Sequence, residues 1–201
     1  MLRETIVWKQ LRHDYILPFI GVDAVTMPGK YCLISPWMEN GTVLHYLENH
    51  PHTDRLTCIR EIVAAIDFIH NLDPKVIHGN IRGNNIIVND KGHCCLADFG
   101  ASIVVTTKVP SHSTMSQNSS RWLCPELQVY DPTTYVLDHL PGRDIYALGC
   151  TIIEVCGSYM HQCSGIHVPT TDIYSQRSLY LYSTCYCSSR HHNQRRSLST
   201  A

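Results

Sequence analysis

Apolar residues recur at three- and four-residue steps between residues 57 and 72, and this spacing predicts an amphipathic helix. The apolar stripe consists of Ile59, Ile62, Val63, Ile66 and Ile69. Asp54 and Thr57 are candidate N-caps, because their side chains can accept hydrogen bonds from unpaired N–H groups of the first turn. A second helix is predicted over residues 142–157. Nearly every turn of that segment carries apolar residues on all sides, so we expect it to be fully buried.

Two shorter helices are predicted nearer the N-terminus. Residues 3–13 fit a short amphipathic helix with Glu4 near its start. The residues that fall on neighbouring turns of this helix are Ile6, Val7, Gln10 and Leu11. Residues 39–50 indicate a turn followed by another short helix.

Alternating or continuous short apolar runs predict several strands. These runs cover residues 17–25, 31–38, 76–80, 85–90 and 93–100. Turns are predicted at Pro28-Gly29 and at Lys91-Gly92, where each pair separates two such runs. Residues 101–120 are rich in Ser and Thr and are predicted to form a long loop.

Size and charge limit the functional classes. A chain of 201 residues fits one domain or most of one, and its 44% hydrophobic content is enough to build a core. A net charge of −1 gives no electrostatic reason to expect nucleic acid or an anionic membrane as a partner. We find neither an apolar run long enough to span a bilayer nor a signal-peptide pattern, so the default expectation is a cytoplasmic location.

Ten cysteines raise the question of disulfides or zinc. Most of them are scattered inside apolar runs, and no C-x-x-C occurs, so we interpret them as small buried hydrophobic residues. The one local cluster, Cys185, Cys187, His191 and His192, has spacings too tight for an ordinary zinc finger.

The composition changes after Gly157. Residues 158–201 contain nine serines and four arginines but only one acid, Asp172. Periodic apolar patterning is scarce there, which favours poor order for residues 158–201. We therefore place the folded domain at residues 1–157.

Three residues between 82 and 98 suggest phosphate chemistry. The amide oxygen of Asn85 and the carboxylate of Asp98 are hard oxygen ligands of the kind that Mg²⁺ prefers. Gly100 would let the chain bend sharply after Phe99. Arg82 lies three residues before Asn85, where its guanidinium can face a phosphoryl group.

Six motifs in order resemble those of eukaryotic protein kinases. "HGNIRGNN", followed after twelve residues by "DFG", is similar to the catalytic loop and the magnesium motif of that family. "RETIVWKQLRHDYILPFIGV" resembles helix C and the next strand, and "LISPWMENG" resembles the hinge. "RWLCPE" and "RDIYALG" resemble the end of the activation segment and the start of the large C-lobe helix. These motif sequences resemble those of the tyrosine-kinase-like group. The match covers about residues 3–157.

The resemblance implies an α+β fold with a mostly helical C-lobe and a remnant N-lobe of helix C and two strands. It implies ATP and Mg²⁺ as cofactors and protein hydroxyls as phosphate acceptors. Asn85 and Asp98 would bind magnesium, and Arg82 would face the transferred phosphate. The backbone of Pro36 and Met38 would contact adenine.

Other positions receive structural roles from the same resemblance. His78 and Phe99 would be packing residues of the internal spine. Glu4 would be the helix-C glutamate, and Glu126 would end the activation segment. Asp144 would open the large C-lobe helix.

Asn80 departs from the family pattern at the position of the catalytic base. The family has Asp there, where it accepts the proton of the substrate hydroxyl. A carboxamide accepts hydrogen bonds but is not a base at neutral pH, and loss of a general base costs on the order of 10² to 10⁴ in rate. We therefore expect a weak or inactive phosphotransferase.

The family pattern is also incomplete at both ends of this sequence. No glycine-rich phosphate loop occurs, and only two residues precede Arg3, so the lysine that pairs with Glu4 in the family is missing. The helices expected after Gly157 are not recognisable. The alternatives to a truncated kinase domain are a pseudokinase that acts as a binding or scaffold module, and a non-functional fragment from a misread gene. Nucleotide is the only partner indicated; protein partners stay open.

Overall fold

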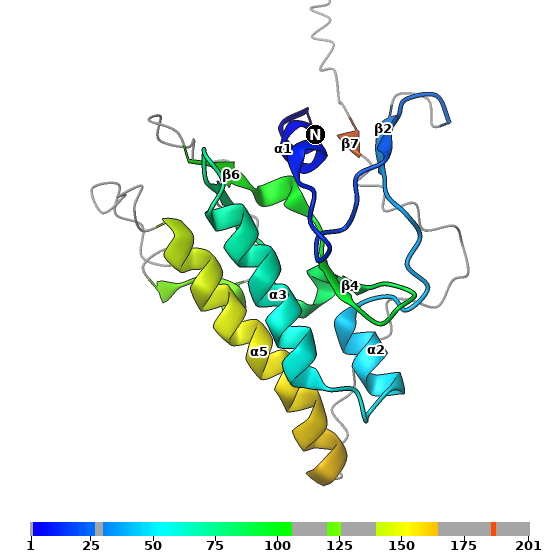
Figure 1. The fold of residues 1–201 in the computed structure, drawn as a ribbon, viewed down its shortest axis with the longest axis vertical. Coiled ribbons are helices and arrows are strands. Elements are labelled where there is room, and N and C mark those ends of the chain that lie inside the picture. Colours follow the sequence, from blue (N-terminus) through cyan, green and yellow to red (C-terminus); the bar gives the residue numbers. More distant parts are fainter. Residues whose placement is uncertain (1, 27–29, 106–119, 126–139, 165–185, 188–201) are drawn as a thin grey trace, which may run out of the picture.

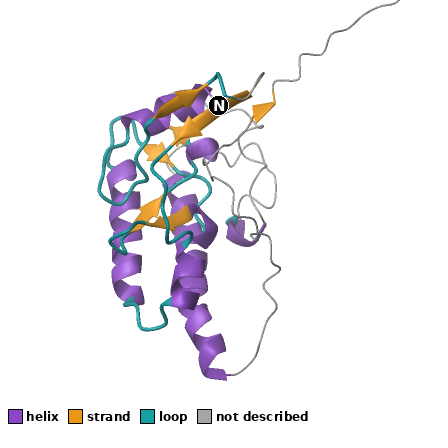
Figure 2. Cartoon of the chain, turned by 90° about the vertical axis from the view of Figure 1, so that its right-hand side faces the viewer, coloured by secondary structure: helices purple, strands orange, loops and turns teal. Residues whose placement is uncertain are grey.

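The computed structural model describes residues 2–26, 30–105, 120–125, 140–164 and 186–187. Its longest helices are α3 (Arg55–His70) and α5 (Leu140–Ser164), which lie side by side in both views (Figures 1 and 2). The shorter helices are α1 (Leu2–Gln10) and α2 (Val43–Asn49). Together with three small sheets they form a mixed α and β fold, as the sequence predicts.

Helix α3 begins after Asp54, whose side chain accepts a hydrogen bond from the backbone N–H of Leu56 at 3.0 Å. Thr57, the other candidate cap, is inside the helix and donates its hydroxyl to Asp54 at 2.6 Å. The predicted apolar stripe is partly wrong. Val63 is 42% exposed, because the buried face of the helix is turned away from this residue. That face consists of Cys58, Glu61, Ile62, Ala65, Ile66 and Ile69.

Helix α1 ends at Gln10, three residues before the predicted end. Its buried side also differs from the prediction, because Ile6 is 52% exposed whereas Trp8 is buried. The Trp8 indole N–H donates to the backbone oxygen of Leu17 at 2.6 Å. This bond fixes α1 against the segment that leads into the first strand.

Helix α5 is longer than predicted and is not fully buried. It runs to Ser164, beyond the predicted end at Gly157. Within residues 140–157, one face is buried at steps of three and four residues, whereas Ile145 and Ile153 are exposed, Ile153 by 69%. The buried positions are Leu140, Arg143, Asp144, Ala147, Thr151 and Val155.

The strands are shorter than the apolar runs that predict them. β1 (Gly21–Asp23) and β2 (Lys30–Ile34) are antiparallel, with Val22 opposite Leu33. The other edge of β2 pairs with β7 (Tyr186–Cys187), from the segment predicted to be poorly ordered. The Pro28-Gly29 turn lies outside the described residues.

Two further antiparallel pairs flank the segment that carries the predicted motifs. β3 (Val76–Ile77) pairs with β6 (Ile103–Val104), so part of the predicted loop at 101–120 is a strand. β4 (Ile86–Val88) pairs with β5 (Cys94–Leu96). The predicted turn between these two strands is confirmed, with Gly92 at φ +83°.

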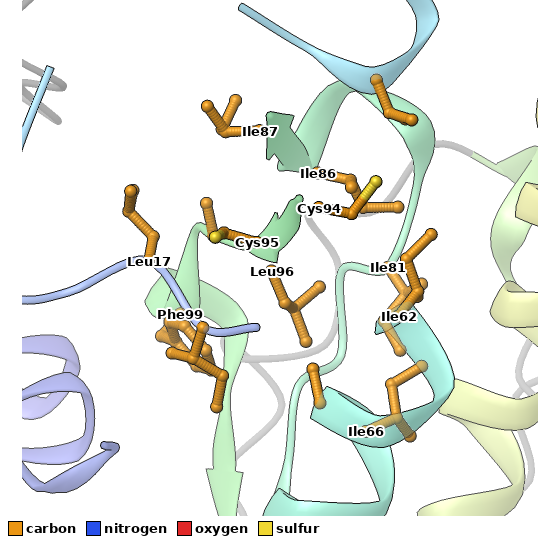
Figure 3. Close-up of a cluster of buried hydrophobic side chains, with 14 of the residues drawn as sticks. Leu17, Ile62, Ile66, Ile81, Ile86, Ile87, Cys94, Cys95, Leu96 and Phe99 are labelled. Atoms are coloured by element: carbon orange, nitrogen blue, oxygen red, sulfur yellow. The ribbon is translucent and has the colours of Figure 1, made fainter. Parts of the chain in front are cut away.

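The main hydrophobic core lies between α3 and the β4–β5 pair (Figure 3). Ile62 and Ile66 of α3 face Ile81 and Leu96 there. Cys94 and Cys95 are buried in the same core, where burial raises the pKa of the Cys95 thiol to about 11. Both cysteines therefore act as packing residues, as predicted. This core supports the two loops that follow Ile77 and Leu96.

No helix among the described residues is long and apolar enough to cross a membrane.

Candidate functional site

The loop from His78 to Asn85 is anchored at its start by Asp144 of α5. Oδ2 of Asp144 accepts the backbone N–H of His78 at 2.7 Å and also lies 2.8 Å from His70 Nε2. Oδ1 accepts the backbone N–H of Gly79 at 2.8 Å. One buried carboxylate thus fixes the direction in which the loop leaves β3.

His78 is fully buried and links this loop to the segment after β5. Its Nε2 lies 3.0 Å from the backbone oxygen of Ala97, and its Nδ1 lies 3.2 Å from the backbone nitrogen of Asn80. Burial lowers the pKa of His78 even though Asp144 acts in the opposite direction. The ring is therefore neutral: Nδ1 accepts from the N–H of Asn80, and Nε2–H donates to Ala97.

Phe99 is the hydrophobic partner of His78. Their ring centroids are 4.9 Å apart in an edge-on arrangement, and Trp8 of α1 stacks on Phe99 at 6.3 Å. The structure thus places His78 and Phe99 in one continuous stack that reaches α1. Their expected packing role is consistent with this placement.

Glycine is required at two positions of the loop. Gly79 has φ +76°, and a Cβ there would lie 2.8 Å from the backbone oxygen of Ala101. A Cβ on Gly83 would lie 2.6 Å from Cγ of Leu44 in α2. A larger residue at Gly79 would force the backbone to move, and one at Gly83 would force the Leu44 side chain to move.

Asn80, Asn85 and Asp98 form the polar centre of the site. The Asn80 side-chain nitrogen donates to Oδ2 of Asp98 at 2.8 Å. The Asn85 side-chain nitrogen donates to the backbone oxygen of Asn80 at 2.7 Å. Asp98 itself has φ +66°, and its Oδ1 accepts the backbone N–H of Gly100 at 3.3 Å. The structure therefore brings together three of the residues that the sequence singled out.

Glu4 reaches the same centre from α1. Its side chain is only 4% exposed, and its Oε2 has no hydrogen-bond partner. A Cβ placed on Gly100 would lie 3.5 Å from Oε1 of Glu4 and 3.2 Å from Oδ1 of Asp98, so both carboxyl groups face one point. Burial, together with the charge of Asp98, raises the pKa of Glu4 to about 7.

Among the described residues, Arg82 and the expected adenine-contacting residues, Pro36 and Met38, make no side-chain hydrogen bond to this centre. Arg82 is half-buried, and its Nε is buried without a hydrogen-bond partner. Pro36 and Met38 follow β2 and are half-buried, and Met38 packs against the main core. The chain just after them is tied to the end of β4, because Gly41 accepts the backbone N–H of Val88 at 2.9 Å.

Glu154 of α5 belongs to the site and is not among the residues that the sequence pointed to. Its Oε2 accepts the backbone N–H of Gly83 at 3.0 Å and the indole N–H of Trp122 at 3.2 Å. It holds the far end of the loop, whereas Asp144 holds the start. The available signal was that Glu154 is the one acid within the largely apolar residues 145–157.

Some predicted features cannot be placed. Glu126 and residues 106–119 lie outside the described residues, as do Cys185, His191 and His192. Over the described ranges, no three His, Cys, Asp or Glu side chains cluster in a way that could hold a metal ion.

The oxygen donors at the centre nevertheless suit magnesium. Asn85 uses its side-chain nitrogen to bind Asn80, so the amide oxygen is the atom that a cation would meet. Together with the Asp98 carboxylate this would give two oxygen ligands from the protein. Mg²⁺ typically takes few protein ligands and fills its shell with water and substrate phosphates.

Comparisons with known proteins point to one family. The family model described as "Protein kinase domain" matches residues 1–196. The chain is 29% identical over 161 residues to the L-type lectin-domain containing receptor kinase I.7 of Arabidopsis thaliana, covering 77% of this chain and 23% of that protein. It is 26% identical over 161 residues to serine/threonine-protein kinase CTR1 of the same plant, covering 77% and 18%.

A third relative is named probable serine/threonine-protein kinase samkB, from Dictyostelium discoideum. It is 33% identical over 185 residues, which is 85% of this chain and 30% of the relative. The chain therefore spans less than a third of the length of each of these three proteins.

Proposed function

The chain belongs to the protein kinase domain family, and from that premise we propose that it is a kinase domain with weak or no phosphate-transfer activity. The family activity is ATP-dependent transfer of a phosphoryl group to a protein hydroxyl. Asn80 carries the proposal, because it stands where the base is expected and donates its side-chain N–H to Asp98.

A carboxamide in this position cannot do the work of a carboxylate. A carboxylate takes a proton from the substrate hydroxyl as that oxygen attacks phosphorus, whereas the Asn80 nitrogen is a donor and its oxygen has negligible basicity. The loop that carries Asn80 is otherwise well anchored by Asp144 and Glu154. The expected defect is therefore chemical and does not arise from a misplaced loop.

The remaining residues support nucleotide binding. Asn85 and Asp98 are proposed to hold Mg²⁺, which when bound neutralises phosphate charge. Arg82 is proposed to face the phosphate through its guanidinium, and the backbone around Pro36 and Met38 to contact adenine. Positioning and charge account for much of the catalysis of phosphoryl transfer, so we expect restoration of a base to this site to give measurable transfer.

The first prediction concerns transfer from ATP. The purified chain, incubated with γ-labelled ATP, Mg²⁺ and a generic protein substrate, should show no transfer above background. Asn80→Asp should raise the rate by a factor on the order of 10² or more, because it restores a proton acceptor. The measurement is incorporation of label over time.

Asn84→Asp is the matched control, because it adds the same charge at an exposed position of the same loop. It should leave the rate at background. Rapid transfer by the native chain that disappears in Asp98→Ala would overturn the proposal.

A second candidate is a binding module that works without phosphate transfer. The exposure of Ile145 and Ile153 on α5 favours it, because apolar side chains on a long helix offer a surface for another protein. The two candidates differ in the Asn80→Asp variant: restored transfer supports an impaired enzyme, and a variant that binds Mg-ATP but transfers nothing supports the binding module.

A further inference from the structure

The hydrogen bond between Asn80 and Asp98 fixes how the carboxamide is oriented. An ionised carboxylate only accepts hydrogen bonds, so the Asn80 atom that faces Asp98 at 2.8 Å must be the NH₂ group. The amide oxygen of Asn80 then points away from Asp98. Asn80 therefore meets Asp98 as a donor, in the manner of a cation.

Asn80 is held in this orientation by its own backbone. Its N–H donates to His78 Nδ1, and its carbonyl oxygen accepts from the Asn85 side chain at 2.7 Å. His78 is completely buried and Asn85 nearly so. Because both partners are buried, they hold the backbone of Asn80 in place beside Asp98.

The two asparagines beside Asp98 add no charge to this site. Asn80 and Asn85 both end in neutral carboxamides. Cation affinity at oxygen sites rises with the number of charged ligands, so two carboxamides beside one carboxylate form a weak cation site.

We propose that the Asn80 carboxamide binds the Asp98 carboxylate where a divalent cation would otherwise bind it, and thereby weakens metal binding at this site. Asn80 is then a determinant of metal affinity, acting through Asp98, and is not itself a metal ligand. The inference rests on the proposed nucleotide site but concerns the metal alone. A divalent cation that binds Oδ2 of Asp98 from the side of Asn80 must displace the amide hydrogen bond.

The test is direct titration of the folded chain with Mn²⁺ in the absence of nucleotide, followed by calorimetry. Asn80→Ala removes the competing donor without adding charge, and it should bind Mn²⁺ roughly two- to tenfold more tightly than the native chain, the factor carried by one net hydrogen bond. Asn80→Asp adds an anionic ligand and should exceed Asn80→Ala by about tenfold or more.

The sign of the Asn80→Ala effect separates the possible roles. Weaker binding would show that Asn80 is a ligand, and unchanged binding would show that it is a bystander; either result overturns the proposal. A gain in Mn²⁺ affinity from Asn80→Ala that persists when Asp98→Ala is added also overturns the proposal. So does a lack of measurable Mn²⁺ binding in all variants, Asn80→Asp included.

Asn84→Ala is the matched control, because it removes a carboxamide from an exposed position of the same loop. It should leave Mn²⁺ affinity unchanged. A cooperative thermal transition of each variant verifies that it is folded. Failure of the proposed function would appear as phosphate transfer by the native chain, whereas failure here appears in the order of metal affinities, so the two failures are distinguishable.

Discussion

At the scale of single residues, Glu4 is a buried carboxyl group whose ionisation is costly. Its carboxyl group is buried beside Asp98, and Oε2 finds no hydrogen-bond partner. The ionised form is disfavoured first by burial and then by the charge of Asp98, which together raise the pKa of Glu4 to about 7. The folded chain thus holds a proton at Glu4 that the unfolded chain releases near pH 4.5.

This difference in proton binding predicts how stability depends on pH. Because the folded state binds the proton more tightly, Glu4 favours folding below about pH 4.5, and that contribution is lost as pH rises from there to about 7. Glu4→Gln removes the titration. We expect this variant to be more stable than the native chain at pH 8 by about 1–2 kcal/mol, with the gap shrinking toward pH 5.

Thermal unfolding of both proteins at several pH values measures the gap. Glu48→Gln, at an exposed carboxylate in α2, is the matched control and should show no such trend. A Glu4→Gln advantage that is constant from pH 5 to pH 8 would contradict the explanation by ionisation.

At the scale of elements, helix α5 holds the site loop at both ends. Asp144 and Glu154 are ten residues apart on one helix, which separates them by about 15 Å along its axis. Asp144 binds the backbone of His78 and Gly79, and Glu154 binds that of Gly83. The loop is therefore fixed to a rigid element and not only to its own neighbours.

Asp144→Asn should destabilise the chain strongly. The carboxylate accepts hydrogen bonds from two backbone N–H groups and faces His70, and an asparagine in its place has only one accepting atom. A buried donor without a partner costs about 1–3 kcal/mol, so we expect a loss of this size in the free energy of unfolding. Chemical denaturation measures it.

Asp90→Asn is the control for this substitution, because Asp90 is exposed in the turn between β4 and β5. It should change stability by less than about 0.5 kcal/mol. Equal effects of the two substitutions would argue against the anchoring role of Asp144.

The elements also show what the sequence could and could not predict. The three- and four-residue period located α3, but it could not choose between Val63 and Cys58 for the buried face, since both fit a wide stripe. The apolar character of α5 was readable, whereas its full length and its exposed side were not, because a pattern does not say where the helix ends or which surface is covered. β6 was missed because its two residues lie next to a Ser- and Thr-rich run.

The sequence predicted which residues form the candidate site, but it did not predict the contacts between them. Spacing and family resemblance pointed to Asn80, Asn85 and Asp98, and the structure brings these three side chains together. That the Asn80 amide donates to Asp98 depends on a pairing across eighteen residues, which a sequence pattern does not encode. Glu154 acts from 71 residues beyond Gly83, and no local motif marks it.

At the scale of the whole molecule, the sheet that contains β1 and β2 is completed by residues from near the C-terminus. β7 pairs with β2 so that Lys30 is opposite Cys187 and Tyr31 is opposite Tyr186. A strand edge left open exposes unpaired N–H and C=O groups to solvent and to other chains. The pairing therefore protects the edge of β2.

Deletion of residues 186–201 should expose this edge. We expect a loss of about 1–2 kcal/mol in the free energy of unfolding, the net value of one or two hydrogen bonds, and faster hydrogen exchange at the backbone of β2. Deletion of residues 188–201 keeps β7 and is the matched control. If the backbone amides of β2 exchange at the same rate in both deletion variants, β7 does not protect β2.

The anchoring of the loop by Asp144 has a consequence for biosynthesis. Asp144 follows Gly79 by 65 residues, so a ribosome that adds about 5–20 residues per second makes it roughly 3–13 s after Gly79. Until then, the His78 and Gly79 amides of the nascent chain can be satisfied only by water or by a transient partner. For that interval of translation, the loop that carries Asn80 lacks the carboxylate that anchors its start.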